Sequence, residues 1–396
     1  MKRLVCRGLL AWLVTGVGLR LIVVQPERCG DPTVVDVRAA ASRTVDWFAR
    51  NQRPDGSWLY RYDRDEGRDL GSYNVVRHAG AILALEQAAT AGHAPAAATA
   101  ERGTAWALAR TVQVPGGRAL AESREAPVLS SGASALLVAG LLERRDRTGD
   151  PVHDDLLVDL GRFLVTMVTP EGAVLGRFDR EHRRPVPDSW SKFYTGEVFW
   201  ALARLHLVFP EGGFAEPAER IAHYLATGRD EAEGWWPPIP DHWAAYGYAT
   251  LVRWPERDPA RPLEADDVRY LRRQAGLQSA QIRYESQRTN SWWTHVTRGR
   301  PTLGAGLGTI GEALDQLWLV TGADPRLADL RPPVAERARC AASVLLARQV
   351  DDDEARRWPE PDRTRGAFFQ FGVTQIDDQQ HTLSALLHVT QVLEAG

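Results

Sequence analysis

The sequence predicts an all-α protein, a single (α/α)6 toroid of six helical hairpins that spans residues 35–396. Two observations support this: helical segments of two kinds alternate from residue 35 onward, and turn signals lie between them. One kind carries many charged residues with apolar residues at helical spacing, whereas the other is apolar nearly all round. A helix with one polar face lies at the surface and a helix without one is buried, so the alternation predicts an outer ring around an inner ring.

The segments follow one another in strict order along the chain. The predicted outer helices are 35–52, 94–112, 150–168, 216–230, 264–282 and 330–349. The predicted inner helices are 72–87, 129–142, 194–209, 241–252, 304–320 and 377–393. The inner segments are rich in small residues, which let neighbouring helices approach closely. Turn signals occur at 53–56, 115–117, 169–172 and 210–213, and no β-hairpin signature competes with the helical pattern.

The N-terminal segment, residues 1–30, has the character of an export signal. Positively charged residues at its start precede an apolar run at 8–19, which continues after Arg20. This pattern is typical of a signal peptide or of an uncleaved signal anchor with its positive end inside. The absence of an A-x-A cleavage site and of a lipobox favours membrane anchoring through residues 8–24, and a buried amphipathic helix is the alternative. We therefore expect an extracytoplasmic protein, membrane-anchored or secreted.

Charge and cysteine content exclude several classes of function. The net charge of the 396-residue chain is −3 and no basic run stands out, so there is no electrostatic basis for binding nucleic acid. Cys6, Cys29 and Cys340 match neither a zinc-site spacing nor a disulfide framework. We expect neither a bound metal nor a cofactor.

Short repeats at the ends of outer helices support the toroid. Residues 47–58, WFARNQRPDGSW, match the spacing (F/Y/W)-L-x3-Q-x3-G-x-W, with Phe48 in the leucine position. Residues 163–174 are a degenerate copy, and VLLARQ at 344–349 ends another outer helix in the same way. Here the chain resembles the QW repeats of the terpenoid cyclase and protein prenyltransferase α/α-toroid superfamily. The resemblance covers about residues 35–396 and implies the toroid, with the glutamine capping the outer helix and the tryptophan packing over the turn.

Polar residues collect where the inner helices begin. In a ring of antiparallel hairpins all inner helices run the same way, so their N-termini share one end of the barrel. Polar side chains at these starts therefore predict a pit, to which the fifth start contributes Thr309 and Glu312. The candidate substrate-binding residues, from the helix starts and the loops before them, are Arg61, Asp63, Tyr73, Asn74, Arg77, His78, Tyr194, Trp235, Trp236, His242, Trp243, Gln379, Gln380 and His381.

Four carboxylates at this end are the candidate acid and base groups: Glu197, Asp241, Asp377 and Asp378. Glu197 lies one or two turns into a helix of core character, where an unpaired carboxylate costs several kcal/mol. Asp241 also suits an N-cap, which contributes ~1 kcal/mol. We expect one of Asp377 and Asp378 to cap the last inner helix and the other to face the pit, and like charges brought close there would raise one of the pKa values.

Three functions compete for such a pit. The first is carbohydrate chemistry, because the architecture resembles that of (α/α)6-barrel glycosidases, polysaccharide lyases and sugar epimerases. Paired carboxylates suit glycoside hydrolysis, and tryptophan rings stack on sugars. The substrate would then be a small molecule or an oligosaccharide. A glycan-binding protein without catalytic activity is another possibility, since it needs the pit but no proton donor.

The remaining function follows from the superfamily resemblance. Class II terpene cyclases protonate an alkene with a D-x-D-D motif at an inner-helix start, and the corresponding positions here are 375–378. Asp377 would be the general acid, but Gln375 replaces the first aspartate of the motif. Arg77 nearby would repel a carbocation, so we rank the cyclase second.

Overall fold

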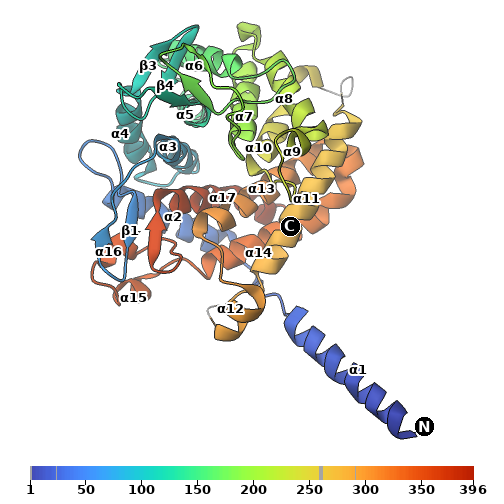
Figure 1. The fold of residues 1–396 in the computed structure, drawn as a ribbon. Helices are drawn as coiled ribbons and strands as arrows, with labels where there is room; N and C mark the ends of the chain where they lie inside the picture. The colour runs from blue at the N-terminus through green and yellow to red at the C-terminus, as the bar shows by residue number, and fades with distance from the viewer. Residues whose placement is uncertain (1, 24, 258–261, 290) are drawn as a thin grey trace.

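The computed structural model describes residues 2–23, 25–257, 262–289 and 291–396, and it confirms the predicted ring of helical hairpins (Figure 1). The inner helices are α3 (Val75–Thr90), α5 (Ser131–Thr148), α7 (Tyr194–Val208), α10 (His242–Leu251), α13 (Gly304–Ala323) and α17 (Ile376–Glu394). The outer helices are α2 (Val34–Arg50), α4 (Ala96–Leu108), α6 (Asp154–Thr166), α8 (Ala215–Thr227), α11 (Ala265–Glu285) and α14 (Arg331–Leu346). Shorter helices in the connections are η1 (Pro210–Gly212), α9 (Arg229–Ala232), η2 (Pro255–Arg257), α12 (Trp292–Arg298), η3 (Pro325–Leu330), α15 (Asp352–Ala355) and α16 (Pro361–Thr364).

The ring closes because each inner helix packs against the next and the last packs against the first. The succession runs from α3 through α5, α7, α10 and α13 to α17, which returns to α3. Glycines permit the close approach: a Cβ at Gly311 of α13 would lie 2.8 Å from Cβ of Ala385 on α17. A Cβ at Gly196 of α7 would lie 2.7 Å from the backbone nitrogen of Ala244 on α10. Larger residues at these positions would force the helices apart, because protein interiors are already close-packed.

Three small antiparallel β-sheets lie in the connections, and the sequence pattern does not predict them. Their strand orders are β2–β1–β8, β3–β4 and β5–β6–β7. The strands are β1 (Arg61–Asp63), β2 (Arg68–Asp69), β3 (Thr111–Val114), β4 (Gly117–Leu120), β5 (Val128–Ser130), β6 (Arg177–Asp179), β7 (Arg184–Pro185) and β8 (Val373–Gln375). They are too short for an alternating pattern to be recognised. β8 bears on function, because it pairs with β1 and leads directly into α17.

The glutamines of the QW-like repeats link successive outer helices. Gln349 follows α14, and its amide nitrogen donates to the carbonyl oxygen of Ala40 at 2.9 Å and to the hydroxyl of Thr44 at 2.9 Å, both on α2. Gln52 follows α2, and its amide nitrogen donates to the carbonyl oxygen of Thr99 on α4 at 3.0 Å. The expected cap on the glutamine's own helix is therefore replaced by a bond to the next outer helix.

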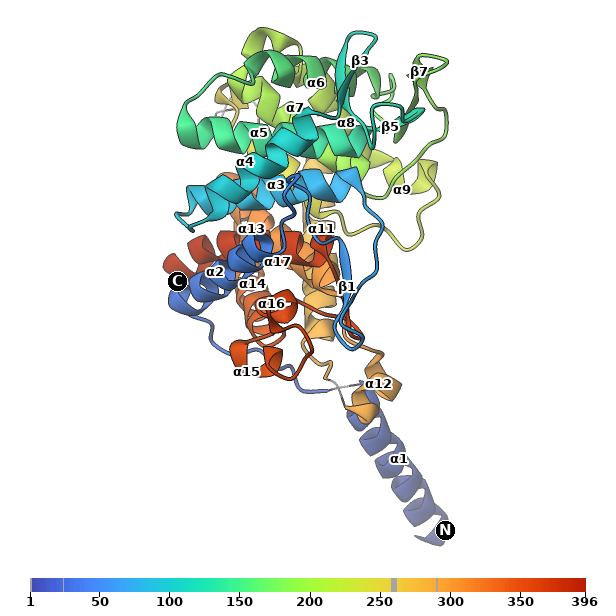
Figure 2. The ribbon, with the colours of Figure 1, turned by 90° about the vertical axis from the view of Figure 1, so that its left-hand side faces the viewer.

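The N-terminal helix α1 (Lys2–Val23) projects away from the ring in both views (Figures 1 and 2). Its stretch from Arg3 to Ile22 is not buried against the rest of the structure. Within the described residues it is the one helix long and apolar enough to cross a membrane, a property that signal sequences share.

A disulfide joins Cys29 to Cys340 on α14, which corrects the expectation that the cysteines form no disulfide framework. The two residues are 311 positions apart, so only closure of the ring brings them together. Glu27 forms ion pairs with Arg337 and, at 3.1 Å, with Arg283. Glu27 and Cys29 are therefore tied to the folded domain.

Candidate active site

The inner helices enclose a pocket of about 370 Å³ at the end of the ring where they begin. All six inner helices contribute to its wall. Of the candidate residues, the pocket is lined by Asn74, Arg77, Tyr194, Glu197, His242, Trp243, Asp377, Gln380 and His381. Phe193, Thr302, Leu303 and Thr309 complete much of the remaining wall.

The start of α17 separates the two adjacent aspartates. Asp378 is buried and accepts hydrogen bonds from the backbone nitrogens of Gln375 at 3.0 Å and Ala305 at 2.8 Å. It therefore closes the N-terminus of α17 and joins it to α13. Burial raises the pKa of Asp378 to about 7, and the neighbouring Asp377 carboxylate adds to the effect. Asp377 faces the pocket instead, where one oxygen lies 3.3 Å from Nε of Arg77 and the other 3.7 Å from Nε2 of His381.

His381 carries a positive charge at neutral pH. Burial alone lowers its pKa, but the carboxylate of Glu312 lies 2.6 Å from Nδ1 and raises the pKa of His381 to about 9. Glu312 also accepts a hydrogen bond from the hydroxyl of Tyr246 at 3.0 Å, so its position on α13 is fixed from two sides. Asp377 faces the same imidazole and also favours its charged form.

His242 is a second histidine of the pocket, and its charge differs from that of His381. It is the first residue of α10, and its ring centroid lies 5.1 Å from that of His381. Burial and the nearby His381 lower the pKa of His242 well below its ordinary value, so this imidazole is neutral at pH 7. Its Nε2 atom has no hydrogen-bond partner among the described residues. The pocket thus holds one neutral and one cationic histidine.

Glu197 adds a third titratable group to the wall. The side chain is buried on α7, and one of its carboxyl oxygens has no hydrogen-bond partner in the part of the chain that the structure describes. Burial, reinforced by the nearby Asp241 carboxylate, raises the pKa of Glu197 to about 8. Glu197 is therefore mainly protonated at pH 7 and can donate a hydrogen bond into the pocket.

Comparison with solved structures identifies the fold. The chain resembles a cellobiose 2-epimerase from Spirochaeta thermophila DSM 6192, with a TM-score of 0.62 and 14% identity over 91% of this chain and 98% of that one. The chain is an (α/α)6 toroid. The toroid also resembles a GH76 α-mannanase from Bacteroides thetaiotaomicron, with a TM-score of 0.58, 10% identity, and coverage of 91% and 96% of the two chains. No protein-family model matches the sequence, and no curated protein matches it.

A terpene cyclase shares the architecture as well. The toroid matches a type II terpene cyclase from Scytonema with a TM-score of 0.52 and 14% identity, over 91% of this chain and 99% of that one. The superfamily resemblance drawn from the QW-like repeats is therefore confirmed at the level of the fold. Identities this low carry no information about the reaction.

Three candidate residues of the toroid, Asp241, Tyr73 and His78, form structural contacts outside the pocket. Asp241 caps α10 by accepting the backbone N–H of Ala244 at 3.0 Å, and it forms a fully buried ion pair with Arg229. It does not line the pocket. His78 is wholly buried: Nε2 bonds the carbonyl oxygen of Gly103 at 2.8 Å, and Nδ1 bonds the hydroxyl of Tyr73 at 2.7 Å. Tyr73 and His78 therefore hold α3 against α4.

Five further candidates also lie outside the pocket wall. Gln379 is buried, with its amide oxygen accepting from the backbone nitrogen of Phe368 at 3.0 Å. Asp63 accepts the backbone N–H groups that follow β1, and Arg61 is exposed on that strand. Trp235 donates to Glu233 at 2.7 Å, and Trp236 is 89% exposed. The loops before the inner helices thus contribute less to the pocket than the sequence analysis expects.

Glu312 is the main contributor that the candidate set omits. The sequence places Glu312 at the correct end of the toroid. Like Glu197, it is a carboxylate within an apolar helix, and such a carboxylate needs a buried partner. That partner, His381, lies on a different helix, so the sequence does not reveal it. Tyr246 is omitted for the same reason.

One cluster in the pocket could hold a metal ion. The ligand atoms of His242, Glu312 and His381 all lie within 4.8 Å of one another. A metal would have to displace the proton that His381 shares with Glu312.

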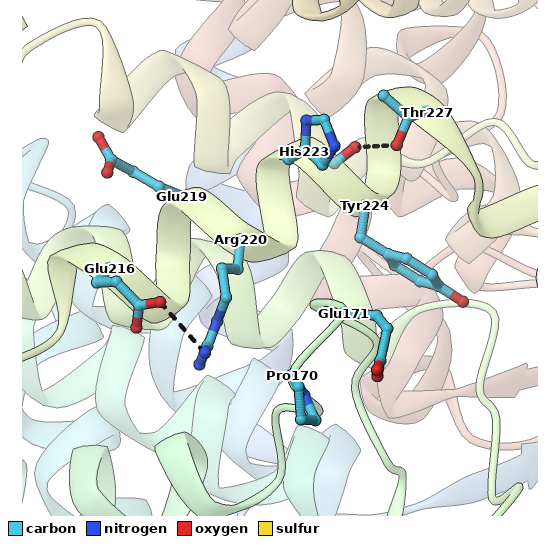
Figure 3. Close-up of a pocket in the computed structure, with 8 residues that line it drawn as sticks. All are labelled: Pro170, Glu171, Glu216, Glu219, Arg220, His223, Tyr224 and Thr227. Atoms are coloured by element: carbon cyan, nitrogen blue, oxygen red, sulfur yellow. Dashed lines mark hydrogen bonds and ion pairs between the residues drawn. The ribbon is translucent and has the colours of Figure 1, made fainter.

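Two other pockets differ from this one in their chemistry. One, of about 830 Å³, lies at the opposite end of the ring, where Arg204 pairs with Glu143 and Asp146. Another, of about 620 Å³, lies outside the ring over α8 (Figure 3). Its groups bond one another, as in the Arg220–Glu216 ion pair at 3.2 Å.

Proposed function

We propose that the toroid is a carbohydrate-active enzyme that epimerises or isomerises a reducing sugar, with His242 as base and His381 as acid. The observation that carries the proposal is a neutral and a cationic imidazole in one pocket, with ring centroids 5.1 Å apart. A general base must be unprotonated and a general acid protonated at the same pH. Burial keeps His242 neutral, and Glu312 keeps His381 charged.

The reaction would proceed by proton transfer without net oxidation. In an open-chain sugar, the hydrogen on the carbon next to the carbonyl is acidic, because the resulting anion is delocalised onto oxygen. His242 would remove that proton, and the electron pair of the C–H bond would form an enediolate. His381 would return a proton to the opposite face of the same carbon, which inverts it. If the proton were instead returned to the neighbouring carbon, and a proton moved from one oxygen to the other, an aldose and a ketose would be interconverted.

Other groups in the pocket suit this chemistry. The guanidinium of Arg77 is held by the hydroxyl of Tyr60 at 2.6 Å and by the amide oxygen of Gln375 at 2.9 Å. Its fixed positive charge would stabilise the enediolate oxygen. Glu197, protonated at pH 7, would donate a hydrogen bond to a sugar hydroxyl, and Trp243 offers an aromatic surface for the sugar. The fold is one that a cellobiose 2-epimerase also adopts.

Glycoside hydrolysis is the second candidate, because the protonated Glu197 and the carboxylate Asp377 line one pocket. Such a reaction needs an acid and a carboxylate that acts as base or nucleophile. Terpene cyclisation with Asp377 as the acid is less suitable, since Arg77 and the cationic His381 would repel a carbocation. A protein that only binds glycans would have no use for a neutral His242 beside a cationic His381.

We also propose that α1 anchors the toroid to a membrane and that the domain works outside the cytoplasm. The apolar helix supports the anchor, and the Cys29–Cys340 disulfide supports the location. Disulfides persist mainly in oxidising compartments, whereas the cytoplasm keeps thiols reduced.

Hydrogen exchange with solvent tests the proposed reaction. The protein is incubated in D2O with reducing monosaccharides and disaccharides, and proton NMR follows the hydrogen next to the carbonyl carbon. We expect deuterium to replace that hydrogen as the epimer or ketose forms. His242→Asn and His381→Asn should each lower the rate by ~10³-fold, as expected for a lost general acid or base.

The exposed Trp236 lies outside the pocket, so Trp236→Phe provides a matched control that should keep the full rate. Cleavage of glycosides without deuterium incorporation would instead favour hydrolysis by Glu197 and Asp377. Absence of exchange with every sugar would refute the proposal.

A further inference from the structure

An apolar surface lies on the short helix α12 (Trp292–Arg298). Trp292 is 74% exposed, Trp293 44% and Val296 63%. Scattered exposed hydrophobic residues are normal, but two adjacent tryptophans and a valine one turn later form a contiguous patch. We call these three residues the α12 patch. In both views α12 lies beside the point where α1 leaves the domain (Figures 1 and 2).

The chain between α1 and the domain is too short to separate them widely. α1 ends at Val23, and the disulfide holds Cys29 against α14. Six residues span at most ~20 Å even when fully extended. The backbone nitrogen of Arg28 also donates to the carbonyl oxygen of Ser286 at 3.0 Å, and Ser286 precedes α12 by only a few residues. Any bilayer that contains α1 therefore lies close to the α12 patch.

The surroundings of the patch match the interface of a bilayer with water. Residues 283–300 contain four arginines and a single carboxylate, Glu285. The guanidinium of Arg288 lies 4.6 Å from the ring centroid of the partly exposed Tyr284. The guanidinium of Arg300 lies 4.5 Å from the ring of the exposed Phe371. Tryptophan and tyrosine concentrate at membrane interfaces, and arginines near them are attracted to anionic headgroups.

We propose that the α12 patch docks on the surface of the phospholipid bilayer in which α1 is anchored. The inference rests on the proposed anchoring by α1 and is independent of the proposed reaction. It gives the toroid a defined orientation on the membrane. The chain continues from α12 into Thr302 and Leu303, which line the pocket, so the docked surface adjoins the wall of the candidate active site.

Photo-crosslinking of the full chain tests the docking. Benzoylphenylalanine replaces Trp292, and the protein is reconstituted into vesicles of phosphatidylcholine and phosphatidylglycerol. The same probe at Trp236 is the matched control, because this tryptophan is also highly exposed but follows α9, which lies apart from α12 in both views. A third probe at the exposed Trp12 in α1 reports on the anchor separately.

After illumination we expect at least about tenfold more phospholipid adduct at position 292 than at position 236, because a docked probe meets lipid at a high effective concentration. Equal yields at 292 and 236 would overturn the docking. A strong adduct at position 12 in that case would show that the anchor is correct and the docking wrong, whereas its absence would refute both. Thermal unfolding of each variant confirms that the probe leaves the domain folded, and the deuterium exchange assay remains a separate test of the reaction.

Discussion

At the scale of single residues, the charge of His381 depends on neighbours from several helices. Glu312 approaches from α13, Glu197 from α7, His242 from α10 and Asp377 from its own helix. Burial alone would make the imidazole neutral, as it does for His242. Burial is the largest single influence, but direct contact between the Glu312 carboxylate and Nδ1, together with the other carboxyl groups nearby, raises the pKa of His381 in spite of it.

Glu312→Gln should therefore change the pH dependence of activity. The substitution removes the charge but keeps the shape, so the pKa of His381 should fall from about 9 toward or below its ordinary value of 6.5. If His381 is the acid, wild-type activity falls as pH rises through about 9, and the variant loses activity at lower pH. Rate measurements across pH, with NMR titration of the imidazole, check this.

Asp315→Asn is the matched control for Glu312→Gln. Asp315 lies one turn away on α13, but neither of its carboxyl oxygens has a hydrogen-bond partner among the described residues, whereas Glu312 contacts His381 directly. Asp315→Asn should leave unchanged the pH at which activity falls on the alkaline side, which we call the alkaline limit. An alkaline limit that stays at the wild-type pH in Glu312→Gln would contradict the assigned role.

The adjacent aspartates should respond in opposite ways to substitution by asparagine. Asp378→Asn leaves one of two backbone N–H groups without an acceptor and should lower the free energy of unfolding by about 1–3 kcal/mol. Asp377→Asn should leave the unfolding free energy nearly unchanged but lower kcat/KM by ~10²-fold, because it releases Arg77 and His381 from their common partner. Chemical denaturation and steady-state rates separate the two effects. A full rate in Asp377→Asn would remove this residue from the mechanism.

At the scale of elements, the outer ring depends on contacts between successive hairpins. Gln349 joins α14 to α2 across the point where the ring closes, and Gln52 repeats the arrangement between α2 and α4. Gln349 also donates to the carbonyl oxygen of Gly366 at 3.2 Å and accepts from Arg43 at 2.8 Å. The repeat therefore stabilises the assembly of hairpins more than any single helix.

Gln349→Ala should lower the free energy of unfolding by about 1–3 kcal/mol, because it removes the hydrogen bonds of a buried amide to Ala40, Gly366 and Arg43. Gln113 is exposed on β3, and Gln113→Ala should change stability by no more than about 0.5 kcal/mol. Urea denaturation measures both. Equal effects of the two substitutions would show that the glutamine link contributes nothing.

At the scale of the whole molecule, the disulfide and the Glu27 ion pairs extend the folded unit beyond the ring. They bind the segment after α1 to outer helices α11 and α14. Cross-linking residues so far apart in sequence restricts the unfolded chain strongly, which stabilises the native state.

Two truncations should then differ. Removal of residues 1–24 should leave a folded domain, whereas removal of residues 1–30 should also fold but lose about 2–4 kcal/mol of unfolding free energy together with the disulfide. Reduction by dithiothreitol should narrow this difference in unfolding free energy, because it breaks the disulfide of the domain that lacks only residues 1–24. Identical denaturation curves for both truncations under oxidising conditions would contradict this expectation.

The ring of helical hairpins, the order of its inner and outer helices and the end at which polar residues collect could all be predicted from the sequence, whereas the helix ends differ by up to six residues, as at α5. Alternating amphipathic and apolar segments sufficed for the prediction, because helical periodicity is a local property and ring closure follows from burying the apolar segments. Glu197, Arg77 and Asp377 could be placed at the pit because each lies at the start of an inner helix. The short strands could not be predicted, since each is defined by its partner across a turn or a distant segment.

Only the tertiary structure decided which polar side chains meet. Asp241 and Glu197 look alike in sequence, yet Arg229 neutralises the first in a buried pair while the second remains in the pocket wall. His78 and His381 both lie near inner-helix starts, but one is enclosed and the other contacts Glu312. Cys29 and Cys340 are separated by nearly the whole domain. Protonation states and covalent pairing depend on burial and on distances between different helices, and these quantities exist only once the chain has closed into a ring.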